Sequence, residues 1–196
     1  MTSRDAKTRL ISAMIDALQR RGLHGSGLTE LLAAAEAPKG VLYHHVPGGK
    51  TELAVAAVEA VVERLCSTLQ ERMGGAAADP AAVLMAWIDA AQARLAESGY
   101  ERGCPLATIA LETTGQDVAI RAALGRGFAR IRAIIAAGLA NAGYAREAAG
   151  SLAALMVAAY EGGLLQARAA GTAEPMTLVG DALQCLLTLH RPKDTP

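Results

Sequence analysis

The chain has 196 residues, of which 52% are apolar and only 3% are aromatic. A chain of this length buries roughly 70% of its unfolded surface when it folds, so its core needs neither disulfides nor a metal. The apolar composition excludes a disordered chain. The many alanines argue against an all-β protein, because alanine is the best helix former and is depleted in strands.

Charge is balanced over the whole chain, with 19 basic and 19 acidic residues, but it is unevenly distributed. Residues 1–50 carry seven basic and four acidic residues, a net of +3, so residues 51–196 carry a net of −3. This asymmetry predicts two parts, a basic head over residues 1–50 and an acidic body over residues 51–196.

The cysteines and the N-terminus indicate a cytoplasmic protein. Cys66, Cys104 and Cys185 are an odd number, far apart, without a CxxC motif, and are expected to be small core residues in a reducing compartment. The N-terminus is charged where a signal peptide would be apolar. Uncharged stretches such as Ala133–Ala145 are shorter than the roughly 18–20 residues that span a bilayer, so no membrane partner is expected.

The first fifty residues are predicted to form three helices separated by glycine and proline. The first helix has one apolar face, and Gly22 ends it. Thr29 is expected to cap a short second helix. Pro38 ends that helix and suits the first turn of a third, which covers about two turns over residues 39–46.

The rest of the chain is predicted to contain six more helices and no strand, which makes the fold all-α with about nine helices. A soft linker is expected at Gly74–Ala78, and Asp79 followed by Pro80 is a typical helix start. The expected helices cover residues 50 to about 73, 80 to about 95, 105–112, 117 to about 142, 146 to about 170 and 175 to about 189.

The two short helices of the head form a helix-turn-helix, whose second helix enters the major groove of DNA. Leu42 and Val46 lie four residues apart and can face the protein interior. Gly40 and Val41 have small side chains at the start of this helix, so the backbone and a valine methyl group can approach a thymine methyl. The residues expected to face outward are Lys39, Tyr43 and His44.

Lys50 is the candidate phosphate contact, because it begins the next helix beside Gly48 and Gly49, where free backbone N–H groups are expected. His44 and His45 point about 100° apart on a helix and cannot share a metal ion. His44 is expected to point outward and His45 inward. We therefore predict no metal site and no cofactor.

The head resembles the TetR family of bacterial transcriptional repressors. The matching segments are Leu28–Ala35 and Pro38–Val46, with a Lys-Gly-x-Leu-Tyr-x-His core that is followed by Pro-Gly-Gly-Lys-x-x-Leu. The Pro-Gly-Gly-Lys variant, the Gly-Cys-Pro-Leu run 103–106 and the Tyr-Glu-Gly-Gly run 160–163 are similar to the LmrA/YxaF-like branch. The resemblance implies DNA contacts at Thr29, Pro38, Lys39, Gly40, Val41, Tyr43, His44 and Lys50.

Two positions depart from the family pattern. Glu36 occupies the turn position where the family usually has glycine, and a glutamate at positive φ costs on the order of 1 kcal/mol. Val46 replaces the family's aromatic residue and gives a smaller apolar side chain under the third helix.

The body is interpreted as a dimerisation and effector-binding domain. Small residues in the helix at 146–170, with the apolar residues of the last helix, can form a core surface and a surface for a second subunit. Its few aromatic residues either fill the core or line a pocket for a small apolar or aromatic effector. The pocket candidates are Trp87, Cys104, Leu106, Ile109, Glu112, Phe128, Met156, Tyr160 and Glu161.

The sequence thus predicts a homodimeric repressor that binds a palindromic double-stranded operator and is released by an effector. An enzyme is not expected, because the GxSxG and HExxH motifs are absent. The alternatives are a helical module that binds a small molecule or acts as an enzyme, in which the first three helices only pack, and a redox sensor that acts through Cys104.

Overall fold

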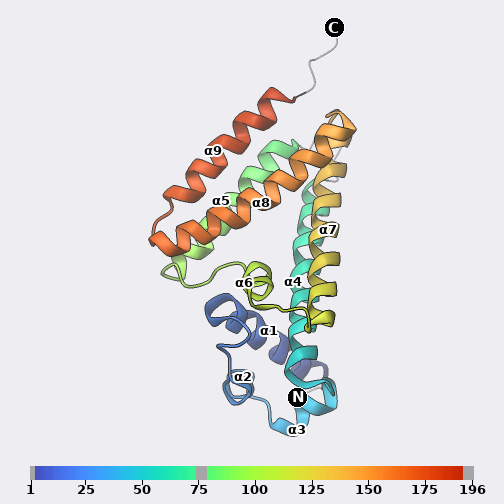
Figure 1. The fold of residues 1–196 in the computed structure, drawn as a ribbon, viewed down its shortest axis with the longest axis vertical. Helices are drawn as coiled ribbons and strands as arrows, with labels where there is room; N and C mark the ends of the chain where they lie inside the picture. The colour runs from blue at the N-terminus through green and yellow to red at the C-terminus, as the bar shows by residue number, and fades with distance from the viewer. Residues whose placement is uncertain (1–2, 74–78, 192–196) are drawn as a thin grey trace. The chain divides into compact units, whose positions relative to one another are not determined.

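The computed structural model describes residues 3–73 and 79–191, with side chains from residue 5 onward, and Figure 1 shows its helices. The linker predicted at Gly74–Ala78 lies outside the described residues. The described part contains nine helices and no strand, which confirms the predicted all-α class. The helices are α1 (Ser3–Arg21), α2 (Leu28–Ala34), α3 (Lys39–His45), α4 (Gly49–Met73), α5 (Pro80–Glu97), α6 (Pro105–Glu112), α7 (Val118–Asn141), α8 (Arg146–Ala170) and α9 (Glu174–Leu189).

Local chemistry sets the start of α5, whereas the expected start of α2 is wrong. Asp79 caps α5, because its Oδ1 accepts a hydrogen bond of 3.0 Å from the N–H of Ala81, and Pro80 follows at the first helical position. The expected cap at Thr29 is wrong. Helix α2 begins at Leu28 and its N-cap is Gly27 in an extended conformation, so Thr29 already lies in the first turn.

The chain divides into two compact units. The first combines the chain up to Arg64 with Gly103–Gly127, and the second combines Leu65–Arg102 with the chain from Phe128 onward. The first unit thus contains α1, α2, α3 and α6 with the first parts of α4 and α7. These units reflect packing, so the functional division at residue 50 remains a prediction.

In the first unit, α1 packs against α2, α3 and α6. Its apolar face is buried as the periodicity predicts, and the second and third helices each add an inward leucine. The fully or almost fully buried residues include Leu10, Met14, Leu18, Leu31 and Leu42. This packing fixes the two short helices, which are too short to be stable alone.

In the second unit, α8 packs against α9 and α5, and α5 also packs against α9. Among the described residues, α8 is the one helix long and apolar enough to span a membrane on length and composition. A core helix meets the same criteria, and 44% of the most apolar stretch of α8 is buried within the fold. Helix α8 thus packs one side on α5 and α9 and leaves other apolar residues exposed, among them Leu155 and Leu165.

The cysteines occupy three different environments. Cys66 is buried, as expected of a small apolar core residue, and Cys104 is half-buried at the N-cap of α6. The expectation is wrong for Cys185, which is exposed on α9. The reason is helical position. Leu183 and Leu187 lie one turn apart and take the inward face, and Cys185, two residues from each, points to the opposite side of the helix.

Candidate nucleic-acid interface

Helix α1 holds the C-terminal end of α2. Nε of Arg9 donates a hydrogen bond of 2.8 Å to the carbonyl oxygen of Ala35, and its guanidinium also contacts Asp5 at 2.9 Å. At the other end of α2, Arg21 forms an ion pair of 3.1 Å with Glu30. Asp5 and Arg9 lie one helical turn apart, but the contacts with Ala35 and Glu30 reach another helix, so the helical pattern of α1 does not indicate them.

The turn between α2 and α3 is tight and contains the departure noted in the sequence. Glu36 has a φ of 49°, in the left-handed region that glycine normally occupies. The N–H groups of Glu36 and Ala37 donate to the carbonyls of Ala33 and Leu32 at 3.1 and 3.0 Å. Pro38 then adopts the extended conformation that starts α3.

Helix α3 presents a polar face to solvent over an apolar anchor. Leu42 and Val46 are 0% and 1% exposed, as the four-residue spacing predicts. The exposed residues of the helix are Lys39, Gly40, Tyr43 and His44, while Val41 and His45 are half-buried. The predicted outward face is therefore confirmed as an exposed surface, and its contact with DNA remains a prediction.

The other predicted DNA contacts surround this face. Thr29 and Pro38 are exposed, and Lys50 is half-buried in the first turn of α4. The Tyr43 ring lies beside the α3–α4 turn, since a side chain at Gly49 would meet its Cε1 at 3.7 Å. The two histidine rings meet edge-on at 4.9 Å, and the described residues contain no cluster of three metal-binding side chains.

One part of the predicted phosphate contact is wrong. The N–H of Gly48 donates to Oε2 of Glu52 at 2.6 Å, and the N–H of Gly49 donates to the carbonyl of Val46 at 2.9 Å. These donors are therefore occupied, because the start of α4 satisfies them with its own first-turn carboxylate and the preceding turn. A phosphate at Lys50 would have to rely on the ammonium group or displace Glu52.

The effector-pocket candidates divide between the two compact units. Cys104, Leu106, Ile109 and Glu112 belong to the first unit, where Leu106 and Ile109 are buried in α6. Trp87, Phe128, Met156, Tyr160 and Glu161 belong to the second unit.

In the second unit, α5 and α8 bring two of these candidates together. The rings of Trp87 and Tyr160 stack at 4.1 Å with an angle of 12° between their planes. The indole Nε1–H of Trp87 is buried and has no hydrogen-bond acceptor among the described residues. A buried donor without an acceptor costs about 1–3 kcal/mol, so a bound acceptor would be favourable here.

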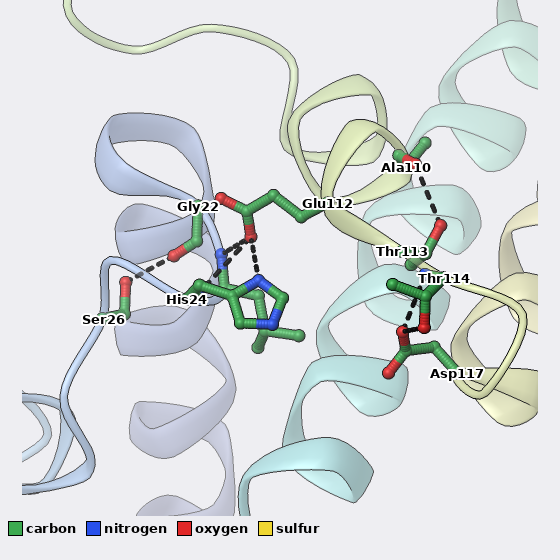
Figure 2. Close-up of polar contacts among 9 residues, drawn as sticks. Gly22, His24, Ser26, Ala110, Glu112, Thr113, Thr114 and Asp117 are labelled. Atoms are coloured by element: carbon green, nitrogen blue, oxygen red, sulfur yellow. Dashed lines mark hydrogen bonds and ion pairs between the residues drawn. The ribbon is translucent and has the colours of Figure 1, made fainter.

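Glu112 has a partner that the sequence does not indicate. It ends α6, and its Oε2 accepts hydrogen bonds from the N–H groups of Leu23 and His24 in the segment that follows α1. Figure 2 shows this carboxylate against the loop of the head. The partners are 89 and 88 residues away along the chain, so no local pattern could identify them.

A three-helix head with an exposed second helix of a helix-turn-helix, joined to a body of further helices, defines the class of helix-turn-helix transcription regulators. The family model for "Transcriptional regulator LmrA/YxaF-like, C-terminal domain" matches residues 80–182, which is more than half of the chain. The chain belongs to this LmrA/YxaF-like branch of the TetR family of transcriptional regulators.

Relatives match over nearly the whole length. The chain is 27% identical to the HTH-type transcriptional regulator LmrA of Bacillus subtilis over 95% of this chain and 99% of LmrA. It is 28% identical to the regulator YxaF of the same organism, over 95% and 98%. The solved structure of the regulatory protein TetR from Rhodobacter sphaeroides superposes with a TM-score of 0.82 at 25% identity, covering 92% of this chain and 98% of that one.

Proposed function

We propose that the chain is a cytoplasmic, homodimeric repressor that binds a palindromic operator through α3 and is released by a small molecule. In this proposal residues 1–50 bind DNA, and residues 51–196 dimerise and hold the effector. The observation that carries it is the exposed face of Lys39, Tyr43 and His44 above the buried anchor of Leu42 and Val46. A polar helix face supported in this way fits the major groove.

The residues of this face take different roles. Lys39 and Lys50 supply positive charge for phosphates, and the Tyr43 hydroxyl reaches a phosphate oxygen. Gly40 presents no side chain, so the backbone at the start of α3 can approach base edges, where Val41 can meet a thymine methyl. His44, Thr29 and Pro38 complete the contact surface.

The experiment is a gel shift and footprint on the DNA upstream of the protein's own gene. We expect protection of two half-sites whose centres lie about 34–36 Å apart, one per subunit. The specific duplex should bind at least about 10³-fold more tightly than a scrambled duplex. Equal affinity for the two duplexes would refute operator recognition. It would favour a body that binds small molecules with a head that only packs.

Apolar stripes on α8 and α9 support the dimer. On α8 the exposed or half-exposed residues Leu155, Ala158, Gly162 and Leu165 repeat at helical spacing, and on α9 the exposed residues Leu178, Ala182, Cys185 and Leu189 do the same. Exposed leucines in such stripes are typical of a surface that a second subunit covers. A dimer also presents two copies of α3 to a two-fold operator.

The stacked Trp87 and Tyr160 support an effector site, because an aromatic surface with a buried, unused N–H donor suits a flat ligand that carries an acceptor. Trp87 is the single tryptophan of the chain, so intrinsic tryptophan fluorescence reports on this site alone. Aromatic compounds that quench this fluorescence should also release the operator duplex. Quenching without release would separate ligand binding from regulation.

Release from DNA requires that the effector bind one conformation of the protein, the one that does not bind the operator, more tightly than the other. Helix α4 runs without a break from Gly49 to Met73, so one helix contributes residues to both compact units. For a hundredfold loss of operator binding, the effector must favour the non-binding conformation by about 2.7 kcal/mol. A transcriptional reporter fused to the upstream DNA tests whether the protein lowers or raises transcription. A repressor lowers reporter expression until the effector is added.

A further inference from the structure

Helix α6 is hydrogen-bonded to residues of the head at both of its ends. Before its start, the N–H of Gly103 donates to the carbonyl of Gln19 in α1 at 3.1 Å. At its end, Oε2 of Glu112 accepts hydrogen bonds of 2.5 and 3.0 Å from the N–H groups of Leu23 and His24, as Figure 2 shows for His24. We call the second set the Glu112 contact.

The Glu112 contact acts on the α1–α2 connector, residues 22–27. Nδ1 of His24 also lies 3.4 Å from Oε2 of Glu112. Two backbone donors on one carboxylate oxygen form charge-assisted hydrogen bonds, which are roughly twice as strong as neutral ones. On the other side of the connector, the hydroxyl of Ser26 donates to the carbonyl of Gly22 at 2.6 Å.

Gly22 leaves room for the carboxylate. Its φ is 78°, and a Cβ at this position would overlap the Glu112 carboxyl group. A glycine is required here both by its left-handed backbone and by the close approach of Glu112. The surfaces of the connector and of the end of α6 are therefore complementary at Gly22.

The position of this contact matters for the proposed function. Helix α6 lies within the segment that matches the C-terminal domain of the family, but it packs in the same compact unit as α1, α2 and α3. The connector leads directly into α2, and α2 leads into α3. A carboxylate on α6 therefore holds the segment that places the DNA-reading helices.

We infer that Glu112 is a positioning residue, which holds the α1–α2 connector so that α2 and α3 keep the arrangement that binds the operator. This inference rests on the proposed function. Glu112 touches neither DNA nor effector in this role, which differs from the pocket anchor that the sequence suggests. A movement of α6 would break the contact and lower the population of the DNA-binding arrangement.

The test compares Glu112→Ala with Thr108→Ala. Thr108 is the matched control, because it lies on the same helix and its hydroxyl bonds the carbonyl of Cys104 just before that helix, at 2.8 Å. If loss of the Glu112 contact leaves a tenth of the molecules in the DNA-binding arrangement, operator affinity falls about tenfold. Thr108→Ala should bind the upstream duplex as the wild type does.

Three further readouts distinguish positioning from general instability. Glu112→Gln keeps an oxygen acceptor for both N–H groups, so it should restore affinity to within about threefold of wild type. The slope of affinity against salt should stay unchanged in Glu112→Ala, because no phosphate contact is lost. Amide exchange of residues 22–27 should accelerate in Glu112→Ala and not in Thr108→Ala.

Each outcome decides the inference. If Glu112→Ala binds the upstream duplex as tightly as Thr108→Ala, the inference is overturned. If Glu112→Ala does not fold, Glu112→Gln and wild-type amide exchange decide, and rapid exchange at Leu23 and His24 in the wild type overturns it. If the wild type does not select its upstream duplex over a scrambled one, the proposed function itself fails, which is a separate result.

Discussion

Glu36 holds a left-handed backbone conformation in the turn before α3, with its side chain exposed. A glutamate at this φ costs on the order of 1 kcal/mol, which glycine does not incur. Glu36→Gly should therefore raise the free energy of unfolding by up to about 1 kcal/mol, less the entropy that glycine adds to the unfolded chain. Urea denaturation measures the change.

Glu36→Ala is the control for this prediction, because it removes the same charge but keeps a Cβ at positive φ. We expect no comparable gain in stability from it. Equal stabilisation by alanine and glycine would show that the charge of Glu36, and not its backbone, is responsible.

Tyr144 gives a pH dependence at the alkaline end. Its hydroxyl donates to the carbonyl of Leu187 at 3.0 Å, and burial raises the pKa of this phenol above its ordinary value. As the pH rises, the unfolded chain therefore ionises at Tyr144 before the folded chain does. The contribution of Tyr144 to stability is fully present below about pH 10 and is lost as the pH rises through the folded-state pKa.

Tyr144→Phe should lower the free energy of unfolding by about 1 kcal/mol at neutral pH, through the lost hydrogen bond. The variant should also lose less stability between about pH 9 and about pH 11 than the wild type. Urea denaturation at each pH measures both effects. Parallel pH curves for the two proteins would contradict the assignment to Tyr144.

At this scale the sequence predicts what depends on neighbours along one helix. The spacing of Leu42 and Val46 indicates their burial, and the glycine position in the family pattern indicates the strain at Glu36. It does not indicate the partner of Glu112, 89 residues away, or that Glu52 occupies the N–H of Gly48. Those contacts depend on tertiary packing and on local competition for donors.

At the scale of elements, the sequence predicts helix boundaries where proline or a capping residue fixes them. Pro105 begins α6 and the predicted end at Glu112 is confirmed, and α8 ends at Ala170 before Gly171 at a φ of 65°. The sequence places the N-cap of α2 at Thr29 instead of Gly27, because Gly27 takes the cap position by its backbone conformation without a side chain.

Helix α7 approaches α4 closely at Gly127. A Cβ at Gly127 would lie 2.5 Å from Cγ2 of Val62, whose β-branched side chain has little freedom to move. Gly127→Ala should therefore lower the free energy of unfolding by about 1–3 kcal/mol. Thermal or urea denaturation measures the loss.

Gly125→Ala is the matched control for this helix crossing. Gly125 lies on the same helix, and a Cβ there would meet no atom within 4 Å, so alanine should stabilise the helix by about 1 kcal/mol. Opposite signs for the two substitutions are expected. If both stabilise the protein, the close approach of α4 and α7 is wrong.

At the scale of the whole molecule, the exposed apolar stripes of α8 and α9 predict the oligomeric state. Leu165 and Leu178 are 57% and 61% exposed in a single chain. Leu165→Glu and Leu178→Glu should shift the dimer toward the monomer by placing a charge in the subunit interface. Analytical ultracentrifugation measures the mass.

Val118→Glu provides the control for the dimer, because Val118 is 70% exposed but lies on α7 outside both stripes. It should sediment as the wild type does. The prediction fails if Leu165→Glu and Leu178→Glu keep the wild-type mass, or if the wild type is a monomer at micromolar concentration.

The head carries a net charge of +3 on a chain with no net charge, and this excess of positive charge supports the proposed DNA contact at this end of the sequence. The central claim is that α3 reads operator DNA. The most direct measurement is the affinity of the wild type and of the Lys39→Ala/Tyr43→Ala double variant for the upstream duplex at several salt concentrations, with Arg132→Ala as an exposed control on α7.

We predict that the logarithm of the affinity of the wild type and of Arg132→Ala falls steeply and linearly with the logarithm of salt concentration. The double variant should bind much more weakly, with a salt slope reduced by about one for each lysine removed from the complex. If the double variant binds the upstream duplex with the affinity and salt slope of the wild type, α3 is not the DNA-reading helix.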